Sequence, residues 1–174
     1  MTRFSLRLTD VNSRISDACQ RFGRNPEEIT LLAVSKRHPV EVIREAAACG
    51  QRHFGENFVQ EALDKIEATP DLDIVWHFIG HLQSNKTRAA AENFGWIHSV
   101  DREKIARRLS DQRPFHAPDL NVCLQVCLED EPGKAGARSD EVVELARSVA
   151  SLPRLRLRGL MAIPPPSEDF DTQR

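Results

Sequence analysis

The stretch ITLLAVSKRHPVEVIREAAACG, residues 29–50, contains one strand and one helix, and the rest of the chain repeats this pattern. Residues 29–35 form an apolar, β-rich run that ends in front of Lys36. Pro39 suits the first turn of a helix, and Gly50 suits the end of that helix. The stretch therefore predicts one strand–helix unit.

The same alternation continues along the whole chain. Apolar runs of strand type occupy residues 29–35, 52–56, 73–80, 96–100, 121–128 and 156–163. Helical patterns lie between these runs, and an amphipathic helix is expected over residues 1–23. Such alternation predicts a parallel sheet covered by helices. An open doubly wound sheet, a (β/α)8 barrel and part of a barrel all fit it. No glycine-rich nucleotide-binding loop follows any of the runs. This disfavours a doubly wound sheet of the nucleotide-binding kind.

Bulk composition narrows the class of protein. A chain of 174 residues with 40% hydrophobic content predicts a single domain over residues 1–174. A net charge of −2 argues against binding nucleic acid through bulk electrostatics. We expect no signal peptide or membrane span, and a cytoplasmic location. Residues 164–174, rich in proline and acidic side chains, are expected to be a loop or a disordered tail.

The four cysteines favour reduced thiols over a disulfide framework. They stand at positions 19, 49, 123 and 127, with no CxxC pair. Cys123 and Cys127 are both expected within one strand, where about four residues of rise hold them too far apart for a disulfide. Scattered thiols of this kind are typical of cytoplasmic proteins.

Lys36 is the first candidate for chemistry, because the carboxyl ends of barrel strands carry functional groups. One interpretation is an ordinary solvated lysine at a strand end. The other is an amine made reactive by partial burial, able to form a Schiff base with an aldehyde. Arg37 and His38 add positive charge nearby, which would favour the neutral amine.

Other polar groups at the expected strand ends have two readings each. Asn57 precedes a helix and can cap it or bind a ligand. Ser84 can likewise cap the helix that LQSNK opens, or that helix can hold an anion beside Lys86. His77 and His81 are spaced like a metal pair, but a strand and Gly80 separate them, so we expect hydrogen bonding and no metal site.

Five motifs together identify a family. They are AVSK (33–36), FGEN (54–57), WHFIGHLQSNK (76–86), SVD (99–101) and GLMAIP (159–164). In order and spacing they resemble the pyridoxal-phosphate homeostasis proteins. The resemblance implies a (β/α)8 TIM barrel of the alanine racemase N-terminal domain type, with about six of its eight strands in this chain. It also implies pyridoxal 5′-phosphate (PLP) bound as a Schiff base on Lys36.

The resemblance assigns roles to further residues and implies a function. Asn57, His81 and Met161 are expected beside the cofactor, and Ser84 and Lys86 at the rim. The implied function is intracellular PLP (vitamin B6) homeostasis without established catalysis, with PLP-dependent apo-enzymes as candidate partners and a monomer or weak dimer as the assembly.

Two other functions stay open. A barrel-type racemase needs a second acid–base group, usually a tyrosine, and the sequence contains none. An RNA- or protein-interaction module is supported only by the alternation of Arg154, Arg156 and Arg158 and by the region of Lys86.

The resemblance also predicts where this chain departs from its family. The loop at residues 129–136 differs from the family's Ser- and Asn-rich version. Two further strands and a phosphate-binding region are expected beyond residue 174, so we expect a C-terminally truncated chain. If the chain is complete, open sheet edges predict weakened cofactor affinity and association through those edges.

Overall fold

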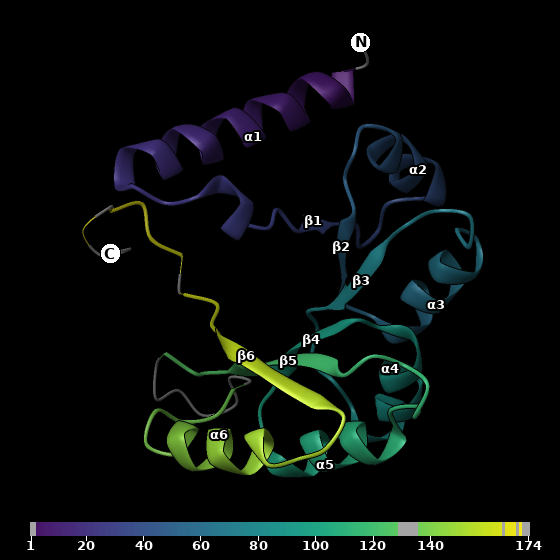
Figure 1. Ribbon diagram of the computed structural model, residues 1–174, viewed down its shortest axis with the longest axis vertical. Coiled ribbons are helices and arrows are strands. Elements are labelled where there is room, and N and C mark those ends of the chain that lie inside the picture. Colours follow the sequence, from purple (N-terminus) through teal and green to yellow (C-terminus); the bar gives the residue numbers. More distant parts are fainter. Residues whose placement is uncertain (1–2, 129–135, 165, 170, 172–174) are drawn as a thin grey trace. The chain divides into compact units, whose positions relative to one another are not determined.

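The computed structural model describes residues 3–128, 136–164, 166–169 and 171 (Figure 1). The chain forms two compact units, with the division between His77 and Phe78. Within the described residues, no helix combines the length and apolar character needed to cross a membrane.

The elements follow the predicted alternation. The first unit contains α1 (Arg3–Phe22), η1 (Pro26–Glu28), β1 (Ala33–Val34), α2 (Val40–Ala48), β2 (His53–Glu56) and α3 (Val59–Glu67). Strand β3 (Val75–Phe78) spans the division between the units. The second contains η2 (Ser84–Lys86), α4 (Thr87–Asn93), β4 (Trp96–Val100), α5 (Glu103–Gln112), β5 (Leu120–Gln125), α6 (Val142–Ala150) and β6 (Leu155–Met161).

The strand order identifies the closure. It runs β1-β2-β3-β4-β5-β6, the same as the order along the chain. The pairs β1–β2, β4–β5 and β5–β6 are parallel. A doubly wound sheet reverses its order at a switch point, whereas a barrel sheet adds each new strand on the same side. The prediction of a barrel-type sheet with six strands is therefore confirmed.

Strand β1 is shorter than the apolar run at 29–35 predicts. Only Ala33 and Val34 pair with β2, opposite Phe54 and Gly55. The Gln51 side chain donates from Nε2 to the carbonyl oxygens of Leu31 (2.8 Å) and His53 (2.7 Å). Because the Gln51 side chain is hydrogen-bonded to the Leu31 carbonyl, pairing with β2 begins two residues later, at Ala33.

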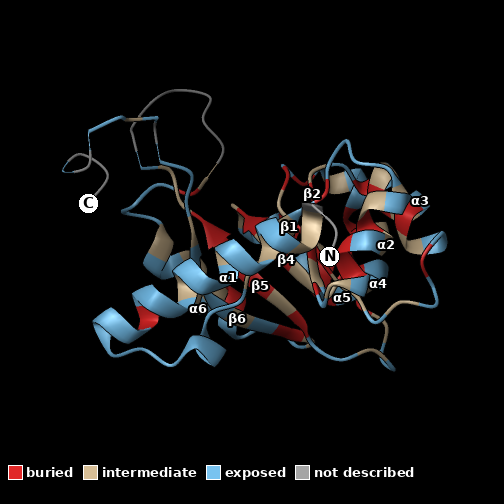
Figure 2. Cartoon of the chain, turned by 90° about the horizontal axis from the view of Figure 1, so that it is seen from above, coloured by how far each residue is buried: buried red, intermediate tan, exposed pale blue. Residues whose placement is uncertain are grey.

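Helix α1 is mostly exposed, as its pale blue colour in Figure 2 shows. Cys19 is its one buried residue among those whose burial is described, and Phe22 at its end is 72% exposed. The expected apolar stripe of this helix is therefore only partly covered.

The core of the second unit lies between the strands and helices α4, α5 and α6. Large side chains fill it, with Phe78 and Phe94 packed edge to face at 5.5 Å between ring centroids. Fully buried residues include Ile97, Ile105, Leu109, Leu120 and Leu124. Strand β6, at the end of the strand order, differs in that Leu155 is buried whereas Leu160 is 63% exposed.

One sequence-based detail is wrong, because Cys127 does not share a strand with Cys123. Cys127 lies beyond β5, because the chain leaves the strand to form a bridge between Val126 and Ala137, and Cys127 N–H donates to the Ala137 carbonyl (2.9 Å). The four cysteines, all in the described part, form no disulfide. Residues 129–135 of the unusual loop, and 165, 170 and 172–174 of the expected tail, lie outside the described residues.

Candidate functional site

Lys36 lies in a tight turn at the carboxyl end of β1. The turn is closed by a hydrogen bond from His38 N–H to the Ser35 carbonyl (3.0 Å). Arg37 adopts a left-handed conformation with φ of 62°. Lys36 is exposed, so the predicted partial burial is not found. Among the described residues its side chain has no hydrogen bond or ion pair, which leaves the amine accessible.

A buried ionic cluster holds the main chain on both sides of Lys36. The Lys65 ammonium donates to the Ser35 carbonyl (2.8 Å), to Glu56 Oε1 (2.7 Å) and to Glu61 Oε1 (2.7 Å). Ser35 Oγ donates to Glu56 Oε1 at 2.6 Å. Arg37 N–H donates to Glu61 Oε1, also at 2.6 Å. We call Lys65, Glu56, Glu61 and Ser35 the Lys65 cluster.

The Lys65 cluster is the main feature that the sequence analysis missed. Glu56 ends the apolar run at 52–56, but the predicted site does not include Lys65. A signal was present in the sequence: Val59, Ala62, Lys65 and Thr69 follow helical spacing, and all four are buried. A lysine on the apolar face of a helix requires a buried partner, because an unpaired buried charge is costly.

Electrostatics keep the partly exposed member of the cluster ionised. The hydrogen bond from Lys65, together with that from Arg37 N–H, lowers the pKa of the Glu61 carboxyl. Side-chain exposure is 29% at Glu61 but 7% at Lys65 and 0% at Glu56. Glu56 Oε2 is buried with no hydrogen-bond partner in the described structure.

Asn57 follows β2, the strand that pairs with the one Lys36 follows. Val34 pairs with Gly55, and each candidate follows its paired residue by two positions. The capping interpretation of Asn57 is wrong, because Phe58 occupies the N-cap of α3 and no side chain caps it. Instead, Asn57 Oδ1 is buried and lacks a partner among the described atoms. It is therefore an acceptor available to a bound donor.

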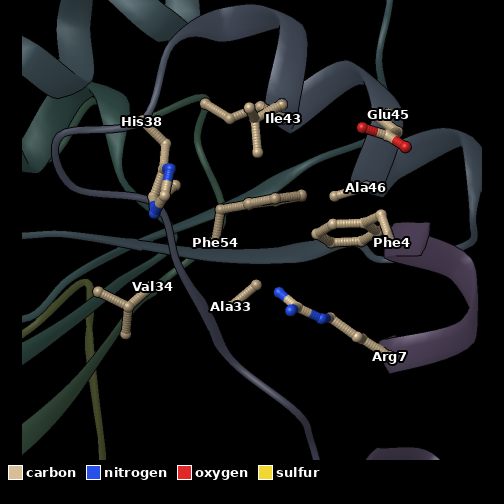
Figure 3. Close-up of a pocket in the computed structure, with 11 residues that line it drawn as sticks. Phe4, Arg7, Ala33, Val34, His38, Ile43, Glu45, Ala46 and Phe54 are labelled. Atoms are coloured by element: carbon tan, nitrogen blue, oxygen red, sulfur yellow. The ribbon is translucent and has the colours of Figure 1, made fainter. Parts of the chain in front are cut away.

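A pocket of about 410 Å³ lies behind the Lys36 turn (Figure 3). Its walls come from α1, α2, β1 and β2, with Phe4, Ile43 and Phe54 around the space. Ser35 and His38 line it, but Lys36 between them does not. The pocket is therefore on the helix side of the strands and is not the space that the Lys36 amine enters.

A pair of histidines joins β2 and β3. His53 Nδ1 and His77 Nε2 are 2.9 Å apart, and their rings meet edge to face. Burial lowers the pKa of His53, which favours the neutral ring. His77 thus bonds to another histidine ring, and no three His, Cys, Asp or Glu side chains among the described residues form a possible metal site.

In the second unit, His81 lies beside an acidic group. His81 Nδ1 is 4.0 Å from Asp101 Oδ2, with side-chain exposures of 54% and 12%. Arg102 donates to both oxygens of Asp101 at 2.7 and 2.8 Å. Asp101, the residue directly after β4, therefore lies beside the loop that carries His81. The His81 ring stays open to solvent.

The other predicted residues of this unit have separate environments. The Ser84 carbonyl accepts from Thr87 Oγ1 (2.9 Å) and Arg108 Nε (3.0 Å). The prediction that the Ser84 side chain caps a helix is wrong. Ser84 lies inside η2, and no side chain caps η2 or α4. Lys86 is exposed. Met161 ends β6 half-buried, and its carbonyl accepts from Val126 N–H at 2.8 Å.

Comparisons with known proteins agree with this architecture. The family model described as alanine racemase, N-terminal domain, matches residues 11–174. A pyridoxal phosphate homeostasis protein of Escherichia coli K12 is 55% identical over 169 residues, which cover 95% of this chain and 72% of that protein.

Solved structures add a ligand to the comparison. PipY of Synechococcus elongatus PCC7942 without PLP has a TM-score of 0.77 and 43% identity, covering 91% of this chain and 74% of that chain. The same protein with PLP bound has a TM-score of 0.73 and 41% identity, covering 87% and 70%.

Proposed function

Because the chain belongs to the family of pyridoxal phosphate homeostasis proteins, we propose that it binds PLP covalently through Lys36 and serves intracellular PLP homeostasis. The aldehyde of PLP condenses with a neutral primary amine and releases one water molecule. The observation that carries the proposal is the accessible Lys36 amine at the end of β1, in a turn that is hydrogen-bonded on both sides.

The other described lysines fit this role less well. Lys65 is buried and bonded to two carboxylates. Lys104 lies within helix α5, and Lys86 lies in η2 rather than directly after a strand. Lys36 alone among the described lysines follows a strand end with a free amine.

One residue close to Lys36 in the fold offers a hydrogen-bond acceptor to a polar ligand. Asn57 Oδ1 is a buried acceptor that has no partner among the described atoms, and Asn57 follows β2 as Lys36 follows β1, the strand paired with β2. A donor on the bound ligand would satisfy it, which removes the cost of a buried unpaired carbonyl. The roles of His81 and Met161 as cofactor-binding residues, and of Ser84 and Lys86 as rim residues, stay predictions that rest on the family resemblance.

The proposal assigns no catalysis to the protein. Its relative in E. coli carries the name of a homeostasis protein, and the sequence contains no tyrosine to act as the second acid–base group of a racemase. Purified protein saturated with PLP should not racemise alanine above the rate of free PLP; enzyme-like turnover would favour the racemase instead. Delivery of PLP to apo-enzymes, cytoplasmic location and assembly state remain predictions.

Absorbance spectroscopy tests the covalent link. Wild-type protein titrated with PLP should develop a band distinct from that of free PLP, and Lys36→Ala should not. Lys104→Ala, which removes an exposed lysine of α5, is the matched control and should behave like wild type. After borohydride reduction, peptide mass mapping should find the added mass on Lys36. An unchanged band in Lys36→Ala would overturn the proposal.

A further inference from the structure

The Lys65 cluster lies directly beneath the turn that carries Lys36. Its hydrogen bonds reach the Ser35 carbonyl on one side of Lys36 and the Arg37 N–H on the other. Both of these main-chain groups belong to the turn, whereas Lys65 and Glu61 come from helix α3. The cluster therefore fixes the peptide groups that flank Lys36 without touching its side chain.

The chemistry of the cluster differs from that of a simple core contact. A buried ion pair generally stabilises a fold no better than apolar side chains of the same size would. Here Lys65 shares a helix face with Val59 and Ala62, where an apolar residue would pack easily. What apolar residues cannot supply is an acceptor for Arg37 N–H and a donor for the Ser35 carbonyl.

Backbone geometry supports the same conclusion. Arg37 has a φ of 62°, a region that residues other than glycine seldom occupy. Such conformations persist where surrounding contacts determine them, and they concentrate at functional sites. The 2.6 Å bond from Arg37 N–H to Glu61 is the contact that holds this residue.

We propose that Lys65, Glu56 and Glu61 are positioning residues that hold the Lys36 turn in the one conformation that presents its amine to PLP. The inference rests on the proposed function, since it concerns the same lysine. Lys65 anchors the turn through the Ser35 carbonyl, Glu56 through Ser35 Oγ, and Glu61 through Arg37 N–H. A ligand that attaches to Lys36 then meets an already ordered main chain, which lowers the entropy lost on binding.

The test compares Lys65→Met with Arg44→Met in the full chain. Lys65→Met keeps the length of the side chain and removes the ammonium. Arg44→Met is the matched control, because Arg44 forms an exposed ion pair with Asp71 in the same unit, away from the turn. Two quantities are measured: the affinity and rate of covalent PLP attachment, and hydrogen exchange at the Arg37 amide without PLP.

We expect Lys65→Met to weaken PLP attachment at least tenfold and to speed exchange at the Arg37 amide at least tenfold. Arg44→Met should change neither by more than about twofold. Glu61→Gln, at a partly exposed position, serves if Lys65→Met does not fold. It should keep the fold, speed Arg37 exchange and slow PLP attachment.

The outcomes separate the two proposals. If wild-type protein attaches PLP at Lys36 and Lys65→Met or Glu61→Gln does so with unchanged affinity and rate, the positioning role is wrong and the proposed function stands. A fall in melting temperature without any change at the Arg37 amide also overturns the positioning role. If wild-type protein attaches no PLP at Lys36, both proposals are overturned.

Discussion

The coupling between Lys65 and Glu56 can be measured as a free energy of unfolding. Lys65→Met removes the ammonium that lies 2.7 Å from Glu56 Oε1 and leaves a carboxylate whose side chain is 0% exposed. Breaking a buried ion pair by removing one member costs about 3–5 kcal/mol. Glu61, with 29% side-chain exposure, can be solvated when Lys65 is lost and adds little to this cost.

Replacing Glu56, the other member of the pair, should lower the free energy of unfolding by less. Glu56→Gln keeps the shape of the side chain, and the Lys65 ammonium retains the Ser35 carbonyl and Glu61. We expect a loss of about 1–3 kcal/mol, the usual range for a buried polar group with an imperfect partner. The double variant no longer contains the buried Glu56 carboxylate that Lys65→Met alone leaves unpaired. The double variant should therefore lose about 2 kcal/mol less unfolding free energy than the two single losses added together. Such non-additivity is usual for residues in one hydrogen-bond network.

Urea unfolding at neutral pH provides the assay. Trp76 lies in the first unit and Trp96 in the second, so Trp76 fluorescence in a Trp96→Phe background reports on the unit that holds the pair. All four members of the cycle should share one slope against urea. Single costs that add within about 0.5 kcal/mol would refute the coupling.

Three further predictions concern other parts of the structure. Arg113→Met should destabilise the protein by about 3 kcal/mol in urea unfolding, because the buried guanidinium donates to three main-chain carbonyls; a change below about 0.5 kcal/mol would contradict this. Burial lowers the pKa of His53 below its ordinary value of 6.5, so the unfolded chain binds a proton that the folded chain does not. Stability should therefore fall as pH drops below about 6.5, and His53→Gln, measured by thermal unfolding across that range, should flatten the decline. Leu160→Lys, at a 63% exposed position on β6, should leave the melting temperature unchanged and reduce any concentration-dependent association in analytical ultracentrifugation.

The strand–helix alternation predicted the fold because each apolar run and each helical period is encoded locally. Each of the six runs overlaps a strand, and Lys36 follows the first of them. The length of β1 was not predictable, since it depends on Gln51 reaching back to the Leu31 carbonyl. Helical spacing indicates that Lys65 is buried, but its partners were not predictable for the same reason: Ser35 and Glu56 are brought to Lys65 only by folding.

Local capping rules failed at Ser84 and at Asn57. Ser84 offers a hydroxyl at the expected helix start, but its carbonyl is held by Thr87 and Arg108 and the residue lies inside η2. Asn57 precedes α3, yet its buried oxygen has no partner within the described part of the chain. Sequence alone recognises the residue types that can cap a helix, whereas the partner chosen depends on the neighbours that folding supplies.

The left-handed Arg37 narrows the shapes available to the peptide that carries Lys36. Glycine would adopt φ of 62° more easily, but it would also admit many other backbone angles in the unfolded chain and in the turn. A residue with a side chain has fewer backbone angles available. Among these, the hydrogen bond from Arg37 N–H to Glu61 selects the uncommon left-handed one. The length and direction of the link between strand β1 and helix α2 are thereby defined by an arginine whose own guanidinium need not take part.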